Sequence, residues 1–483
     1  MKPPKPPSPP GARPVLWTVL AFGALMVLPL PVAVGLGAAA IAVRTGVALA
    51  RRARTRAEPP LIPDQALRAH GLILGATGSG KSTTLLTILG EQIRRGSPVV
   101  AIDLKGSPRF AAELRASAEA SGRRFTLWTP DGAAHWNPLA HGNATELKDK
   151  LIATERFTEP HYRRAAERYV QMAIQVMQES HPERPVTLAG VVAMLEPPRL
   201  AAATRGLPRE RGEYVRAYVS ALTSDQLSAV RGLSARLALL TESHTGRFLE
   251  PGAAGSGNAT LDLRQTLGSD DVVLFSLNSS SYGGLAAQLG TLAVQDLVAA
   301  AGSRLATATE PPLAVVGIDE FSALGSDNVM ALLARGREAG VGVVLATQEL
   351  ADLDRAAHGL RDQVLGNTAI KIAHRQDVPE SAETVARLAG QLKVWDRSYQ
   401  QNPGPLGGRR TSLHLVDRYA IEPEQVRSLQ TGEAVVIVKS PQASARVTRI
   451  RRQVSGASSA QRPASSAQPP ASSAQPPAPG VTR

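Results

Sequence analysis

The chain reads Gly75-Ala76-Thr77-Gly78-Ser79-Gly80-Lys81-Ser82 directly after the short apolar run of residues 71–74. This is the G-x-x-x-x-G-K-S pattern of a phosphate-binding loop. Residues 71–74 predict a buried strand before the loop, and residues 83–89 predict a helix after it, which is the context the motif requires. The glycines let backbone N–H groups turn towards phosphates, and the helix N-terminus adds the positive end of its dipole. We expect nucleotide contacts along residues 75–82 and at Thr83, with Lys81 on the β- and γ-phosphates and the Ser82 hydroxyl on Mg²⁺.

Apolar runs continue along the chain and alternate with helical segments. They occupy residues 98–103, 125–128, 272–277, 313–319, 341–346 and 369–372. Near-continuous apolar strands are typical of a mostly parallel sheet covered on both faces, so we predict a doubly wound α/β fold. Residues 143–250 break the alternation with helical spacing and repeated prolines. We interpret them as an inserted all-α domain; the alternative is a set of long crossover connections.

Composition limits the other possibilities. The 483 residues contain no cysteine, which excludes disulfides and cysteine-based metal sites, and aromatic residues are only 4%. Such a low aromatic content disfavours a single-strand-binding surface built mainly on stacked bases. The net charge is +13, but residues 1–57 hold eight basic residues and no acid. Most of the excess therefore flanks an apolar segment and is better explained by membrane topology.

That apolar segment has 30 uncharged residues between Arg13 and Arg44, long enough to span a bilayer. Pro29 and Pro31 lie in its middle, so one kinked span and a tight hairpin both remain open; a cleaved signal peptide is the alternative. The basic cluster at residues 51–56 predicts that residues 57–483 are cytoplasmic. Residues 1–14 are proline-rich, and residues 453–483 repeat Ala, Ser, Gln and Pro, which predicts a disordered tail.

A second set of polar residues ends the later strands. Asp319 and Glu320 follow an apolar run, where the aspartate is expected to hold Mg²⁺ and the glutamate to act as general base. Gln348 ends the next strand and could sense the γ-phosphate, or simply start a helix. Asp103 and Lys105 share the same predicted edge, and either contact the nucleotide or position Asp319.

These residues together resemble the type IV coupling proteins of bacterial conjugation, the TraG/TraD-type membrane ATPases. The resemblance covers most of residues 60–450. Besides the phosphate loop it rests on ordered segments: Ile102-Asp103-Leu104-Lys105-Gly106, Trp136-Asn137-Pro138-Leu139, Leu274-Phe275-Ser276-Leu277, Gln295-Asp296-Leu297, Ile318-Asp319-Glu320-Phe321, Ala339-Gly340-Val341, Ala346-Thr347-Gln348 and Gly366-Asn367-Thr368. The compact apolar segment departs from the family's two clear spans with a small external loop.

The resemblance implies a RecA-like motor domain, a membrane anchor and a hexameric ring that uses ATP and Mg²⁺ to move a relaxase–DNA complex into a type IV secretion channel. Lys81, Ser82, Asp319, Glu320 and Gln348 take the family's nucleotide roles. An arginine completing the neighbour's site is expected at Arg375, with Arg335 and Arg337 as rivals. The expected organisation is a proline-rich start (1–14), a membrane segment (15–50), an ATPase domain (57–142 and 251–452), the inserted domain (143–250) and the tail (453–483).

Two other functions stay open. A septal chromosome translocase has the same fold but usually more spans and a C-terminal winged-helix domain. A membrane receptor could bind nucleotide and recruit substrates without motor activity. The presence of Lys81, Asp319 and Glu320 favours a working ATPase over the receptor.

Overall fold

The computed structural model describes residues 60–451, except 133, 156, 158, 253–257, 308–309, 325 and 402–408. Residues from Ile62 onward form one compact unit, and the account below concerns that unit. The predicted proline-rich start, membrane segment and C-terminal tail lie outside the described residues.

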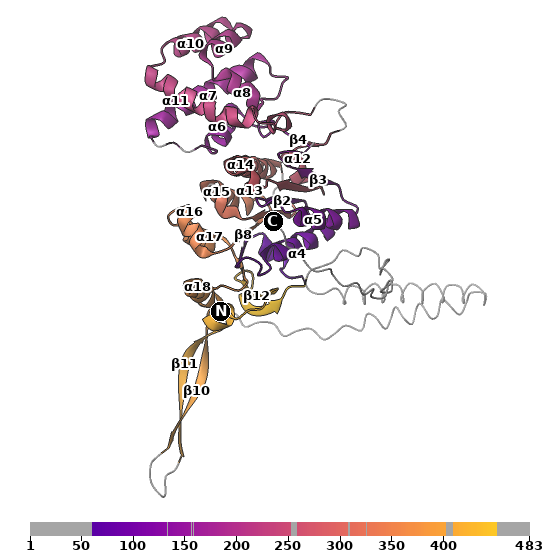
Figure 1. The fold of residues 1–483 in the computed structure, drawn as a ribbon, viewed down its shortest axis with the longest axis vertical. Helices are drawn as coiled ribbons and strands as arrows, with labels where there is room; N and C mark the ends of the chain where they lie inside the picture. The colour runs from indigo at the N-terminus through magenta and orange to yellow at the C-terminus, as the bar shows by residue number, and fades with distance from the viewer. Residues whose placement is uncertain are drawn as a thin grey trace, which may run out of the picture. The chain divides into compact units, whose positions relative to one another are not determined.

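A nine-stranded sheet forms the centre of the unit (Figure 1). Its seven central strands are parallel, and two antiparallel strands extend one edge. In spatial order the strands are β13 (Ser444–Arg449), β12 (Glu433–Val438), β9 (Ile370–Ala373), β1 (Gly71–Leu74), β8 (Val341–Thr347), β7 (Ala314–Asp319), β2 (Val99–Asp103), β6 (Val272–Ser276) and β3 (Phe125–Trp128). The predicted mixed α/β fold with a mostly parallel sheet is confirmed, and the apolar runs mark its seven parallel strands to within one or two residues.

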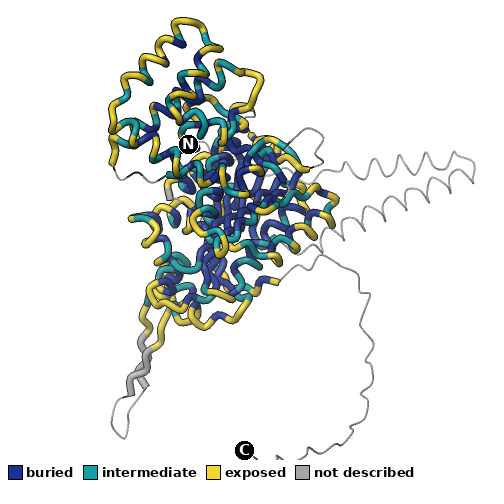
Figure 2. The backbone as a smooth tube through the Cα atoms, turned by 45° about the horizontal axis from the view of Figure 1, so that its top comes forward, coloured by how far each residue is buried: buried dark blue, intermediate teal, exposed yellow. Residues whose placement is uncertain are grey.

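Helices cover the sheet, and strands β1, β2, β7 and β8 are therefore buried along their whole length. Figure 2 shows this interior in dark blue beneath exposed outer surfaces. At mid-strand, Gly317 gives helix α4 room, since a Cβ there would lie 3.0 Å from Leu89 Cδ1. The helices of this layer are α3 (Asp64–Leu67), α4 (Lys81–Arg94), α5 (Pro108–Ala120), α12 (Leu263–Gly268), α13 (Ser279–Tyr282), α14 (Gly284–Thr307), η3 (Phe321–Ala323), α15 (Ser326–Gly336), α16 (Leu350–Ala356), α17 (Leu360–Asn367), α18 (Pro379–Ala389) and α19 (Pro423–Arg427).

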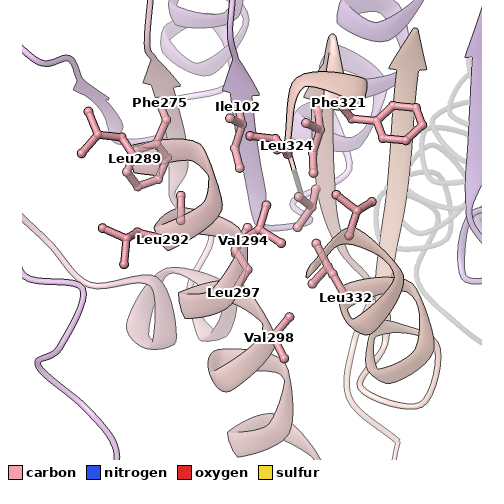
Figure 3. Close-up of a cluster of buried hydrophobic side chains, with 14 of the residues drawn as sticks. Ile102, Phe275, Leu289, Leu292, Val294, Leu297, Val298, Phe321, Leu324 and Leu332 are labelled. Carbon is pink, nitrogen blue, oxygen red and sulfur yellow. The ribbon is translucent and has the colours of Figure 1, made fainter. Parts of the chain in front are cut away.

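Helix α14 is long and packs into the hydrophobic core. Its Leu292, Val294 and Leu297 lie in one cluster with Ile102 of β2 and Leu332 of α15 (Figure 3). Within the described part of the chain, α14 alone is long and apolar enough to cross a membrane, and 61% of its apolar window is buried inside the fold. Its apolar character is therefore explained by the core.

The described residues between the short strands β4 (His135–Trp136) and β5 (Thr260–Leu261) form helices joined by loops and turns. Strands β4 and β5 pair in parallel as a separate two-stranded sheet, so the two ends of this helical segment lie side by side. Its helices are α6 (Ala144–Ile152), α7 (Pro160–Ser180), α8 (Leu188–Met194), α9 (Pro197–Ala203), η1 (Thr204–Gly206), α10 (Arg209–Ser220), α11 (Ser224–Thr241) and η2 (Gly246–Phe248). That it forms a domain of its own stays a prediction.

A buried polar network joins the helical segment to the core. Lys150 of α6 donates to Asp296 Oδ1 of α14 at 2.7 Å, and Trp136 Nε1 donates to Asp296 Oδ2 at 3.0 Å. Lys150 also donates to the carbonyl oxygen of Pro138 at 2.9 Å, so its buried charge is fully surrounded by acceptors. Residues 136–139 and 295–297, two of the segments on which the family resemblance rests, thus meet at this junction.

The remaining strands, β10 (Gln391–Gln401) and β11 (Arg409–Tyr419), pair only with each other. They form a long antiparallel ribbon after α18 (Figure 1). The sequence analysis did not predict this ribbon or the added strands β12 and β13.

Candidate functional site

The phosphate loop connects the end of β1 to the start of α4. Gly78 and Gly80 have φ angles of +78° and +120°, which side chains rarely adopt, so the loop can turn its N–H groups inward. Lys81 is 5% exposed, and its Nζ donates to the Gly75 carbonyl at 2.7 Å, back across the loop. Burial lowers the pKa of Lys81, and the Glu320 carboxylate opposes that effect.

The acid pair lies against this loop, as the sequence analysis expected. Asp319 ends β7, and its Oδ2 accepts a hydrogen bond from Ser82 Oγ at 2.8 Å. Its Oδ1 is buried and has no hydrogen-bond partner among the described residues. A buried carboxylate oxygen without a hydrogen-bond partner, next to a hydroxyl, is typical of a cation site, and Mg²⁺ takes oxygen ligands of this kind. The residues present therefore fit a magnesium ion.

Glu320 has the left-handed backbone conformation, with φ 58° and ψ 42°, which is costly for a residue with a side chain. Its Oε1 accepts hydrogen bonds from Lys105 Nζ at 2.6 Å and from Gln348 Nε2 at 3.1 Å. Lys81 Nζ lies 4.0 Å from the same oxygen. The strained turn thus places this carboxylate among two amines and an amide.

Gln348 connects the loop to the acid pair. Its Oε1 accepts from Thr77 Oγ1 at 3.0 Å, while its Nε2 donates to Glu320. Both bonds fix the orientation of the amide. A shift of the phosphate loop at Thr77 would therefore reach Glu320 through one side chain.

Asp103 and Lys105 both follow β2, which lies beside β7 with Asp103 opposite Asp319. The Asp103 carboxylate is fully buried and accepts from the backbone N–H groups of Lys105 and Ser107. Burial, with a contribution from Asp319, raises the pKa of Asp103 to about 6. Burial lowers the pKa of Lys105, but the carboxylates of Asp319 and Glu320 outweigh it and the net shift is upward. Lys105 thus binds the Glu320 carboxylate, and the buried Asp103 carboxylate holds the turn after β2 through two backbone N–H groups.

The candidate arginines lie in two places. Arg375 follows β9 at the phosphate-loop edge, where its carbonyl accepts from Ala76 N at 3.3 Å and its Nε lies 3.0 Å from Asp377 Oδ1. Arg335 and Arg337 are exposed near the end of α15, before β8 begins, and so at the opposite edge of the sheet. Of the three arginines, Arg375 alone lies at the edge of the sheet that carries the phosphate loop, and its role in hydrolysis stays a prediction.

His374 is a residue that the sequence analysis missed. It is fully buried against the loop: a Cβ on Gly75 would lie 2.7 Å from His374 Cβ. Its Nδ1 can only donate to the Glu433 carbonyl at 2.9 Å, so Nε2 accepts from the Thr84 hydroxyl at 2.8 Å. Burial lowers the pKa of His374 to about 4. The only sequence signal was a polar residue directly after an apolar strand.

Two family models match the chain. Residues 314–431 match "TraM recognition site of TraD and TraG", and residues 52–112, which include the phosphate loop, match "Helicase HerA, central domain". Both matches support the resemblance to the type IV coupling protein family. The acid pair and Gln348 lie within the first match, and the phosphate loop lies within the second.

Several solved structures share the fold of this chain. Unbound TrwBΔN70, a bacterial conjugative coupling protein, is 17% identical with a TM-score of 0.56, over 81% of this chain and 87% of that one. Plasmid coupling protein TrwB in complex with ADP and Mg²⁺ is 15% identical with a TM-score of 0.56, over 83% and 91%. VirB4 of Thermoanaerobacter pseudethanolicus is 14% identical with a TM-score of 0.50, over 80% and 89%. A comparison with curated protein sequences gave no match.

Proposed function

We propose that this chain is a membrane-anchored ATPase that couples Mg·ATP hydrolysis to the transfer of DNA, with its relaxase, into a type IV secretion channel. One observation carries the ATPase part: Ser82 and Asp319 meet at 2.8 Å beside the phosphate loop, with one Asp319 oxygen left free. A bare glycine-rich turn would have no reason to hold a buried, half-satisfied carboxylate.

The residues divide the chemistry between them. Lys81, held at the loop by the Gly75 carbonyl, would exchange that acceptor for the β- and γ-phosphates. Bound Mg²⁺, held by Ser82 and Asp319, would neutralise charge on the phosphate oxygens. Glu320 binds Lys105 and Gln348 through Oε1, so Oε2 remains to take a proton from the attacking water. Gln348, which binds both Thr77 and Glu320, would keep the Glu320 carboxylate at a fixed position relative to the phosphate loop.

The transfer part has separate support. The family match at residues 314–431 carries the description of a TraM recognition site, and TrwB is itself a conjugative coupling protein. By resemblance, the helical segment is the substrate-recognition region and the working form is a homo-hexamer. The uncharged residues 14–43 with their basic flanks would anchor the ring in the inner membrane.

Hydrolysis by the purified full chain in lipid nanodiscs, with and without Mg²⁺ and with single- or double-stranded DNA, tests the proposal. We expect Mg²⁺-dependent hydrolysis that DNA stimulates and that Lys81→Ala abolishes. Arg109→Ala, which removes an exposed side chain of α5, is the matched control and should hydrolyse normally. Hydrolysis indifferent to every DNA form would argue against a DNA motor.

The same variant separates the motor from the receptor in a conjugation assay. A motor that also recruits substrate keeps docking but loses transfer when Lys81 is replaced. Unchanged transfer by Lys81→Ala would favour the receptor, and DNA-stimulated hydrolysis without any role in transfer would favour a chromosome translocase.

A further inference from the structure

The β10–β11 ribbon holds half of the large apolar side chains that are exposed in the described part of the chain. Five of the ten lie on it: Leu392, Val394, Trp395, Leu413 and Leu415. Trp395 is 66% exposed, whereas the core residues Trp128 and Trp136 are fully buried. In Figure 2 the described part of the ribbon is mostly exposed. Such a concentration on one element indicates a surface that meets an apolar partner.

The strand register assigns these side chains to both faces of the ribbon. Trp395 lies opposite Leu415, and Arg397 lies opposite Leu413. Because side chains alternate with a period of two, Lys393 shares the face of Trp395 and Arg397. Leu392 and Val394 belong to the other face. The first face thus carries Trp395, Leu413 and Leu415 together with Lys393, Arg397 and Asp417, and the second carries Leu392 and Val394 together with Asp396, His414 and Arg418.

An isolated two-stranded ribbon is at best marginally stable in water. This ribbon leaves apolar side chains on both faces uncovered, so its partner has to accept both faces. Binding of a nucleic-acid strand by base stacking needs aromatic side chains, and Trp395 is the only aromatic one among these five exposed residues. The interfacial zone of a bilayer can take both faces, with Trp and Leu in the acyl boundary and Lys and Arg among the headgroups.

We propose that the β10–β11 ribbon inserts into the surface of an anionic lipid bilayer with the apolar side chains of both faces, Trp395, Leu413 and Leu415 on one and Leu392 and Val394 on the other, and with Lys393 and Arg397 on the headgroups. Charge complementarity supports this choice, since residues 391–419 contain five basic and two acidic residues. Each basic residue near such a surface adds attraction to anionic lipids.

The proposed membrane anchor gives a second reason, and the inference rests on it. Residues 44–61 separate the uncharged stretch from the compact unit. Even fully extended, 18 residues reach only about 65 Å. In an anchored chain Ile62 therefore stays within about 65 Å of the bilayer, which raises the effective concentration of lipid for the unit that carries the ribbon.

The absence of cysteine allows a direct test on the full chain. A single cysteine at Leu415→Cys carries an environment-sensitive fluorophore, and the chain is placed in nanodiscs that contain spin-labelled lipids. The control label is at Leu239→Cys, which is 69% exposed on α11. We expect a blue shift and strong quenching at the ribbon in discs with phosphatidylglycerol, and neither at the control. Lys393→Gln and Arg397→Gln should each lower the ratio of inserted to free ribbon about fivefold.

Three results would overturn the proposal. The ribbon label could stay unquenched in anionic discs; it could be shielded only by added single-stranded DNA; or it could transfer energy to a second copy without lipid quenching. A Leu413→Cys label repeats the test if Leu415→Cys disturbs the ribbon. Failure of the anchor is distinguishable, because the chain would then not copurify with the discs. Failure of the ATPase leaves this readout unchanged.

Discussion

Acidification is expected to destabilise the fold through His70, which precedes β1 and is 2% exposed. Its Nε2 donates to the Leu333 carbonyl at 2.8 Å, and its Nδ1 accepts from the Val343 N–H at 3.1 Å. A second proton, on Nδ1, would point at that N–H, so the site holds a neutral ring. Burial lowers the pKa of His70 to about 4, with a smaller contribution from Arg337.

Because the pKa of His70 is lower in the folded chain than in the unfolded chain, the free energy of unfolding falls on acidification. Above pH 6.5 the ring is neutral in both folded and unfolded chains, so its contribution to stability is complete. As the pH falls from 6.5 to 4 the unfolded chain takes up the proton first, and stability is lost by about 1.4 kcal/mol per pH unit. Between pH 7 and pH 5 the loss through His70 is about 2 kcal/mol.

Urea unfolding of the full chain in detergent, followed by circular dichroism at both pH values, measures this loss. His70→Asn gives up stability at pH 7 but has no imidazole to titrate. Contributions from other groups, such as His374, are common to both proteins and cancel. Wild type should therefore lose about 2 kcal/mol more than the variant between pH 7 and pH 5. Equal losses would refute the neutral, buried assignment of His70.

Three further outcomes follow from the site and the core. In Gly75→Ala the new Cβ would lie 2.5 Å from Ser79 Oγ, so titration with a fluorescent ATP analogue should show lost binding; tight binding would contradict the loop geometry. Lys150→Met leaves the Asp296 carboxylate buried without its cation and should cost about 3–5 kcal/mol of unfolding free energy, much of it recovered when Asp296→Leu is added. Arg375→Ala should keep ATP affinity while kcat falls by about a thousandfold, and an unchanged kcat would remove it as the arginine that acts in trans.

The sequence was informative where one rule decides the outcome. The phosphate loop has a fixed pattern, and inner strands such as β1 and β7 are nearly continuous apolar runs because both of their faces are buried. Asp319 and Gln348 were found because the carboxyl ends of parallel strands share an edge. The same rule placed Lys105 at this edge, but its partner could be identified only from the side-chain geometry.

Long-range contacts and unusual surfaces were out of reach. The Lys150–Asp296 pair joins residues 146 positions apart, and no local pattern marks it. The ribbon has apolar side chains on both faces, so the one-sided alternation that signals a strand is missing around Trp395. His374 depends on the shape of the loop that it packs against, which sequence patterns do not contain.

The most direct test of the central claim is the rate of Mg²⁺-dependent ATP hydrolysis by Glu320→Gln beside its affinity for ATP. The glutamine keeps the size of the side chain but cannot take a proton from water. The account predicts that Mg·ATP still binds while hydrolysis falls by about a hundredfold or more. Hydrolysis at the wild-type rate, with binding intact, would contradict the assignment of this edge of the sheet as the catalytic site.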